Sequence, residues 1–183
     1  MIIKCMNVYG SQGEKKMIND IIRSEINEYL ERFYLAPADK DSMFDAETAF
    51  KDGNVEGTNI PVSSLEELVD SAGETFCEML FRKIKEKGLT DSEVYKKADM
   101  DRKLFSKIRS NPAYHPQKKT VIALALALEL PINEFNDMLA RAEYALSPSD
   151  RGDLIVRFFV EHGVYDIMTI NFTLDEYGQE IIG

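Results

Sequence analysis

The chain has 183 residues, of which 44% are hydrophobic and 30% are charged, as in an ordinary globular protein. It is acidic, with a formal net charge of −10. No apolar run approaches the roughly 20 residues that a membrane-spanning helix needs, which argues against a membrane protein. The N-terminus makes a poor signal peptide, and neither of the two cysteines lies in a metal-binding pattern. These features predict a cytoplasmic protein without a metal or another cofactor.

Residues 1–62 are predicted as an N-terminal region. Within it, residues 2–9 favour a short strand, and residues 15–34 favour a helix whose apolar side chains recur on one face. The stretch 35–61 is acidic, contains Pro and Gly and has little periodicity, which is typical of a linker. An isolated amphipathic helix of this length is marginally stable. We therefore expect it to pack on the main domain or on the same helix of a second chain, in a homodimer.

Residues 63–147 are predicted as a domain of five helices. The serine pair at 63–64, followed by acidic residues, favours the start of a first helix that runs to Gly88, a typical C-terminal stop. Thr90 is expected to cap a second helix, and Asp101 a third, short one.

The rest of the chain continues the helical pattern. After a loop with two prolines, the nearly all-apolar stretch 118–130 predicts a central helix that is buried on several faces. Pro131 ends this helix and starts the next. Residues 148–183 are predicted as a helical extension, with one helix that stops at Gly163 and a last helix over 165–178. Because no convincing sheet is found, the predicted class is all-α.

The order of the five helices resembles the DNA-binding domain of the Cro/phage-repressor (Xre-like) helix-turn-helix family. The resemblance is carried by "GLTDSEVYKKADMDRKLFSKIRS" and "HPQKKTVIALALALELPINE". Leu89, Thr90, Asp101, Pro116 and Thr120 fall where the family has its Leu-Thr pair, its cap and its Pro followed by Thr. The resemblance implies a five-helix repressor-like core that binds double-stranded DNA.

Three positions depart from the family pattern. Tyr95 stands where the family has a small residue that lets the two helices cross closely, and Asp99 stands where the turn usually has Gly. Asp91 replaces a frequent Gln, whose amide can reach a phosphate that a carboxylate repels. These departures favour the shape of the motif over its use on DNA.

A narrower resemblance extends into the C-terminal part of the chain. "MLARAEYALSPSDRGDLIVRFFVEHGVYDI" is similar to a helical tail module of Gram-positive bacterial proteins, which sometimes follows a macro domain. Residues 2–9 and 15–34 also look like the last strand and helix of such a domain. No loops that bind ADP-ribose are present in the sequence, so the resemblance carries no macro-domain activity over.

Positive charge is concentrated in one part of this acidic chain. Residues 82–119 hold 12 Lys and Arg against 5 Asp and Glu, a net of +7, whereas residues 1–75 and 148–183 are net −8 and −5. On the predicted third helix, Phe105 and Ile108 point inward and leave a basic face outside. The candidate nucleic-acid-binding residues are Arg102, Lys103, Ser106, Lys107, Arg109, Lys118 and Lys119.

A helix with cations on its outer face fits the major groove of B-DNA, which is about 12 Å wide. The sequence therefore predicts a bacterial DNA-binding transcriptional regulator. The alternative is a helical protein-interaction or adaptor module without DNA binding, whose basic face meets an acidic protein partner. No hydrolase, phosphate-loop or zinc-protease motif is present, and two histidines cannot build a His-rich metal site. No catalytic residue and no enzymatic activity are predicted.

Overall fold

The computed structural model describes residues 12–34 and 73–183, with side chains from Asp20 onward in the first range. The predicted strand at 2–9 and the predicted linker lie outside the described residues. Residues 12–34 and 75–183 belong to one compact unit. The described residues form helices and no strand, which confirms the all-α class for this part of the chain. The helices are α1 (Gln12–Phe33), α3 (Phe76–Glu86), α4 (Asp91–Lys97), α5 (Arg102–Ser110), α6 (Lys118–Ala127), α7 (Ile132–Arg141), α8 (Arg151–Glu161) and α9 (Ile167–Glu176).

Short polar side chains start several of the described helices, and Thr90 and Asp101 do so where the sequence predicts. Thr90 caps α4 with a reciprocal pair of bonds: its hydroxyl accepts from the backbone N–H of Glu93, and the Glu93 carboxylate accepts from the backbone N–H of Thr90. Asp101 caps α5 by accepting from the backbone N–H of Lys103. Asp150 and Asp166 cap α8 and α9 in the same way.

The first helix of the predicted five is interrupted within its predicted range. A continuous helix from 63–64 to Gly88 is wrong, because residues 73–75 are not helical and α3 begins at Phe76. Thr75 and Glu78 form the same kind of reciprocal cap as in α4, with distances of 3.3 and 2.8 Å. The predicted stop is confirmed: Gly88 follows α3 with a φ of +64°, a left-handed conformation that glycine adopts without strain.

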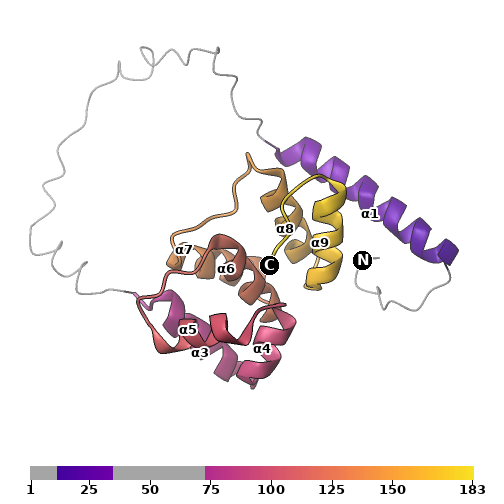
Figure 1. Ribbon diagram of the computed structural model, residues 1–183. Helices are drawn as coiled ribbons and strands as arrows, with labels where there is room; N and C mark the ends of the chain where they lie inside the picture. Colours follow the sequence, from indigo (N-terminus) through magenta and orange to yellow (C-terminus); the bar gives the residue numbers. More distant parts are fainter. Residues whose placement is uncertain (1–11, 35–72) are drawn as a thin grey trace, which may run out of the picture. The chain divides into compact units, whose positions relative to one another are not determined.

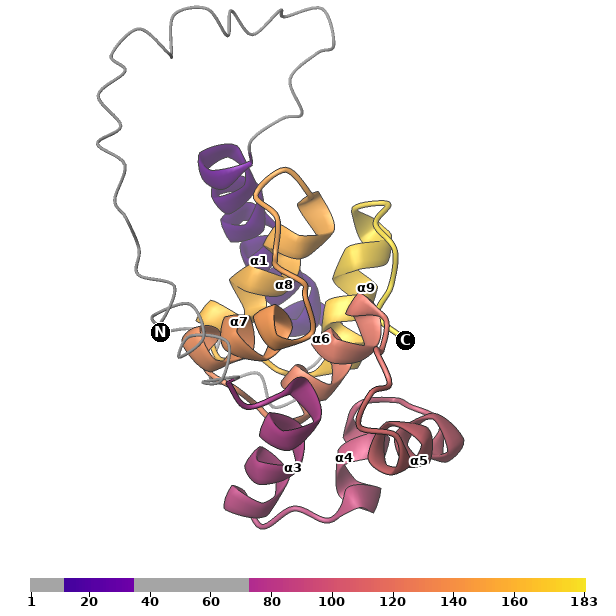
Figure 2. The ribbon, with the colours of Figure 1, turned by 90° about the vertical axis from the view of Figure 1, so that its left-hand side faces the viewer.

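The central helix α6 is buried on all its faces over 121–127, as the sequence predicts. Leu124, Leu126 and Leu128 are fully buried although they point in different directions. This is achieved because α4, α7 and α9 each pack against α6. Four residues of α8 belong to the same core: Leu154, Ile155, Phe158 and Phe159. Helices α3 to α5 lie on one side of α6 and α7, and helices α1, α8 and α9 lie on the other (Figure 1 and Figure 2).

The amphipathic helix α1 packs on its own chain. Its apolar stripe, formed by Ile22, Ile26 and Leu30, is buried against the core, and α1 contacts α8. The Tyr29 ring meets the Phe158 ring edge-on at 5.4 Å between centroids. Of the two predicted arrangements for this helix, the structure has the one within a single chain. A homodimer is therefore not needed to cover the stripe.

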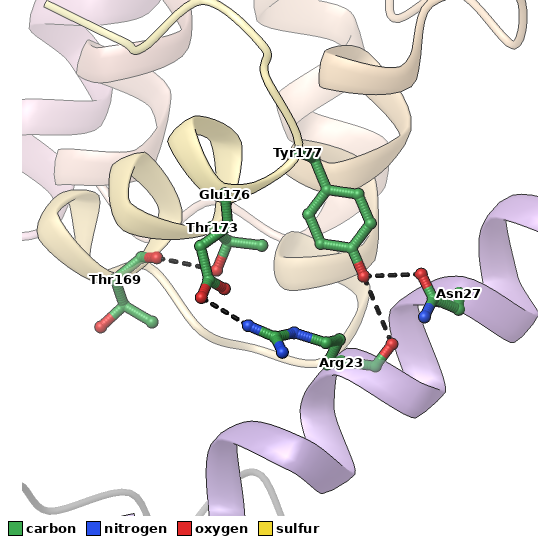
Figure 3. A network of polar contacts seen from close by, with 6 residues as sticks. All are labelled: Arg23, Asn27, Thr169, Thr173, Glu176 and Tyr177. Carbon is green, nitrogen blue, oxygen red and sulfur yellow. Dashed lines mark hydrogen bonds and ion pairs between the residues drawn. The ribbon is translucent and has the colours of Figure 1, made fainter. Parts of the chain in front are cut away.

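Polar contacts join α1 to the end of α9 (Figure 3). The guanidinium of Arg23 lies 2.6 Å from the carboxylate of Glu176. The Tyr177 hydroxyl donates to the side-chain oxygen of Asn27 at 2.7 Å. These exposed contacts each stabilise the packing only weakly, and together they tie α1 to the C-terminal end of α9.

Candidate nucleic-acid interface

The turn between α4 and α5 contains a residue in the left-handed conformation. Asp99 has a φ of +47°, a left-handed conformation, at the position where the family usually has Gly. The backbone N–H of Met100 donates to the carbonyl of Tyr95, and that of Asp99 donates to the carbonyl of Lys96. This pattern closes the C-terminus of α4 as a Schellman motif. An aspartate can therefore replace the expected glycine here, at some cost in backbone strain.

The crossing of α4 over α5 is apolar and tightly filled. Val94 and Ala98 of α4 are buried, as are Phe105 and Ile108 of α5, which confirms the predicted inward face. Tyr95 is only half-buried, and its ring centroid lies 6.0 Å from that of Phe105. The tyrosine therefore packs beside the crossing, where the small Ala98 side chain leaves room for close approach.

The outer face of α5 begins with an open basic surface. Arg102, Lys103 and Ser106 are exposed, as the sequence predicts. Within the part of the chain that the structure describes, the side chains of Arg102 and Lys103 have no carboxylate partner. Both cations are therefore available to a ligand at the N-terminal half of α5.

The cations in the C-terminal half of α5 contact neighbouring side chains. The Lys107 ammonium lies 4.4 Å from the centroid of the Tyr114 ring, a cation–π contact. The Arg109 guanidinium forms an ion pair with Asp91 and lies 4.9 Å from the centroid of the Phe81 ring. All the same, Lys107 and Arg109 remain exposed. Their positions are fixed by neighbours, and the charge of Arg109 is offset by Asp91.

Lys118 and Lys119 at the start of α6 have different surroundings from the cations of α5. The Lys118 ammonium lies 2.5 Å from the carboxylate of Asp153, whose side chain is only 8% exposed. Asp153 also accepts from the backbone N–H of Ser147 at 2.7 Å. Lys119 pairs with Glu180 at 3.1 Å. Carboxylates of the C-terminal region therefore offset both charges, and these lysines do not extend an open basic face.

The described residues offer little for other site chemistry. They contain no cluster of three or more His, Cys, Asp or Glu side chains that could hold a metal ion. Cys77 is buried, and burial raises the pKa of its thiol. None of the described helices is long and apolar enough to cross a membrane.

One surface was missed by sequence reasoning. Met168 and Phe172 of α9 are 79% and 58% exposed, and Ile181 after α9 is 49% exposed. Beside Met168 an open groove of about 680 Å³ runs between the ends of α4 and α6 and the start of α9. The sequence shows these residues as apolar positions of a helix, a pattern that is also typical of a buried core.

The described part of the chain is all-α. Its exposed basic helix, α5, follows a tight turn. No family model, no curated protein and no solved structure matches the chain.

Proposed function

We propose that the chain is a bacterial DNA-binding transcriptional regulator of the helix-turn-helix type, and that α5 enters the major groove of duplex DNA. The observation that carries the proposal is the two-sided character of α5. Phe105 and Ile108 anchor one side in the core, while Arg102, Lys103 and Ser106 share the open side. The basic side of a helix held in this way can approach phosphates and base edges.

The exposed residues suit different parts of this task. Arg102 stands in the first turn of α5, and its planar guanidinium can bind a guanine edge through two hydrogen bonds. Lys103 and Lys107 are point charges, which suit phosphate oxygens better. Ser106 can donate to a base or a phosphate. The proposal assigns base reading to Arg102 and phosphate contact to the two lysines.

The ion pair between Arg109 and Asp91 weakens the main objection from the sequence. Asp91 was expected to repel a phosphate, but the Arg109 guanidinium offsets its charge in the free protein. Asp99 and Asp101 remain exposed at the same edge, and they reduce the non-specific attraction of DNA. Open cations on α5 next to exposed carboxylates suit a protein whose DNA binding depends on a few specific contacts.

Binding of the full chain to a fluorescently labelled random duplex, measured by anisotropy at about 50 and 200 mM salt, tests the proposal. Affinity should fall with salt, with a log–log slope of about −0.9 per phosphate neutralised. Lys103→Gln or Lys107→Gln should each reduce that slope by about one, whereas Arg102→Gln should relax sequence preference. Lys85→Gln on α3 and Arg23→Gln on α1 are the matched controls. No binding at about 50 mM salt would refute the proposal.

A second candidate is a helical interaction module that binds an acidic protein through the same face of α5. It is favoured by the small number of open cations, since Arg109 and Lys107 are already engaged. If duplex DNA does not bind, charge reversal by Lys103→Glu and Lys107→Glu should disrupt the complex with such a partner. In that case the same substitutions would not alter the result of the DNA assay, because the unmodified chain does not bind duplex DNA either.

A further inference from the structure

The exposed face of α9 carries large apolar side chains on successive turns. Met168 and Phe172 are four residues apart and share a face, while the opposite face of α9 is buried in the core. Asn171 exchanges two hydrogen bonds with the backbone of Ile182, at 2.8 and 2.7 Å. These bonds hold the C-terminal segment, which includes the exposed Ile181, against Asn171 of α9. We call Met168, Phe172 and Ile181 the α9 apolar patch.

The groove beside Met168 adds depth to this surface. Its floor includes Leu126, Ala127 and Ile167, which are apolar and belong to the core. Its volume of about 680 Å³ falls in the range of pockets that bind ligands or large side chains. A partner that lies on the α9 apolar patch can therefore insert a bulky apolar side chain next to Met168.

Carboxylates outnumber ammonium groups around the patch. From residue 158 to the C-terminus the sequence has no Lys or Arg and five acidic residues, three of which, Glu161, Glu176 and Glu180, pair with basic side chains from other parts of the chain. Among them, Asp166 and Asp175 are exposed on α9 and have no basic partner within the described residues. Three carboxylates and two ammonium groups line the groove, and one of the latter, Lys97, pairs with Glu129 at 2.8 Å. An apolar surface with this rim is complementary to a basic amphipathic partner.

We infer that the α9 apolar patch and its groove bind a basic amphipathic helix of another protein. The partner's apolar side chains cover Met168 and Phe172, and one of them enters the groove. Its Lys and Arg side chains face Asp166 and Asp175. Methionine suits such a surface because its flexible side chain adapts to the shape of the helix that covers it. The inference does not depend on DNA binding, since α5 takes no part in it.

Two synthetic peptides test the inference on the full chain. The first is a fluorescein-labelled helix of Leu and Lys with Leu on one face, and the second replaces every Lys by Glu. The Lys peptide should bind at least about ten-fold more tightly than the Glu peptide. Phe172→Ala should weaken its binding by about ten-fold, and Asp175→Asn should weaken it a few-fold. Leu104→Ala on α5 and Glu143→Gln after α7 are controls that should leave it unchanged.

Equal binding of the two peptides, or binding that Phe172→Ala leaves unchanged, would overturn the inference. A photoreactive p-benzoylphenylalanine at position 172 identifies the occupant directly. Cross-linking to the Lys peptide supports the inference. Cross-linking within the chain, or to a second copy together with a doubled mass in sedimentation, would show that the protein itself covers the patch, and would also overturn it.

Discussion

Arg102 and Lys103 at the start of α5, and Lys118 and Lys119 at the start of α6, are both pairs of adjacent cations in the first turn of a helix. The sequence predicts the same role for both pairs. In the folded chain the first pair is open, whereas the second lies against Asp153 and Glu180 of the C-terminal region. Charge counted along a sequence therefore overestimates the surface available to a polyanion, because distant acids can take up part of it.

The largest expected effect concerns the anchor that keeps the first pair facing outward. Phe105 is 2% exposed and contacts both Phe81 and Tyr95. Phe105→Ala should lower the free energy of unfolding by about 3–5 kcal/mol, measured by urea denaturation. Ser106→Ala, one residue along the same helix, should change it by no more than about 0.5 kcal/mol. A loss of under about 1 kcal/mol for Phe105→Ala would mean that the faces of α5 are assigned wrongly.

Variants of the two cation pairs should differ in the property that they change: the free energy of unfolding for one pair and the DNA affinity for the other. Lys118→Met leaves the buried Asp153 carboxylate without its counter-charge, so the free energy of unfolding should fall by about 1–3 kcal/mol. Lys103→Met removes an exposed charge without a partner and should change stability by no more than about 0.5 kcal/mol. The DNA affinity should show the reverse order, with Lys103→Met the more damaging variant.

Matching losses of affinity for the two variants would show that Lys118 also contacts DNA. Equal stability would show that its pair with Asp153 contributes nothing measurable. Either result would remove the distinction between an open and a structural cation pair. Chemical denaturation and anisotropy titration on the same preparations make the comparison direct.

A smaller effect is expected at the other end of α5. Asp91→Asn should release the Arg109 guanidinium from its ion pair and remove a charge that repels phosphate. Since exposed pairs contribute roughly 0.2–1 kcal/mol, duplex affinity should rise about 1.4- to five-fold. Asp137→Asn breaks a comparable pair with Arg141 on α7 and is the matched control. An equal rise in both variants would mean that only net charge matters.

Much of the fold could be predicted because its signals are local. Thr90 and Asp101 cap helices that start at the next residue, and the apolar stretch after Lys118 is too hydrophobic to lie anywhere but in the core. The start of α3 was missed because Ser63 and Ser64 offer the same kind of cap as Thr75. The structure describes the capping bonds between Thr75 and Glu78, which start α3 at Phe76.

The candidate site was harder to predict for a different reason. Lys118 and Asp153 are 35 residues apart in the sequence, and no periodic pattern links them. The α9 apolar patch was missed because α9 has apolar residues on both faces, so spacing alone cannot tell Ile170 from Phe172. Long-range pairing and the choice of the buried face are properties of tertiary packing, which local patterns do not determine.

The smallest expected effect lies far from α5, where α1 packs on α8. Burial, and the hydrogen bond that its hydroxyl donates to Glu161 at 2.9 Å, raise the pKa of Tyr29 to about 12. In the unfolded chain a tyrosine ionises near about 10, so the folded form keeps its proton where the unfolded form loses it. This contribution to stability is complete below about pH 10 and is lost as the pH rises toward the folded value.

Tyr29→Phe should therefore flatten part of the fall in unfolding free energy between about pH 10 and 12, measured by urea denaturation. Some slope should remain, because burial also raises the pKa values of Tyr165 and Tyr177. Duplex affinity at neutral pH should stay unchanged, since α1 and α5 lie on opposite sides of α6 and α7 (Figure 2). If the variant has the same slope as the unmodified protein, the folded structure does not raise the pKa of Tyr29. If the variant has an altered duplex affinity, the packing of α1 on α8 affects DNA binding by α5.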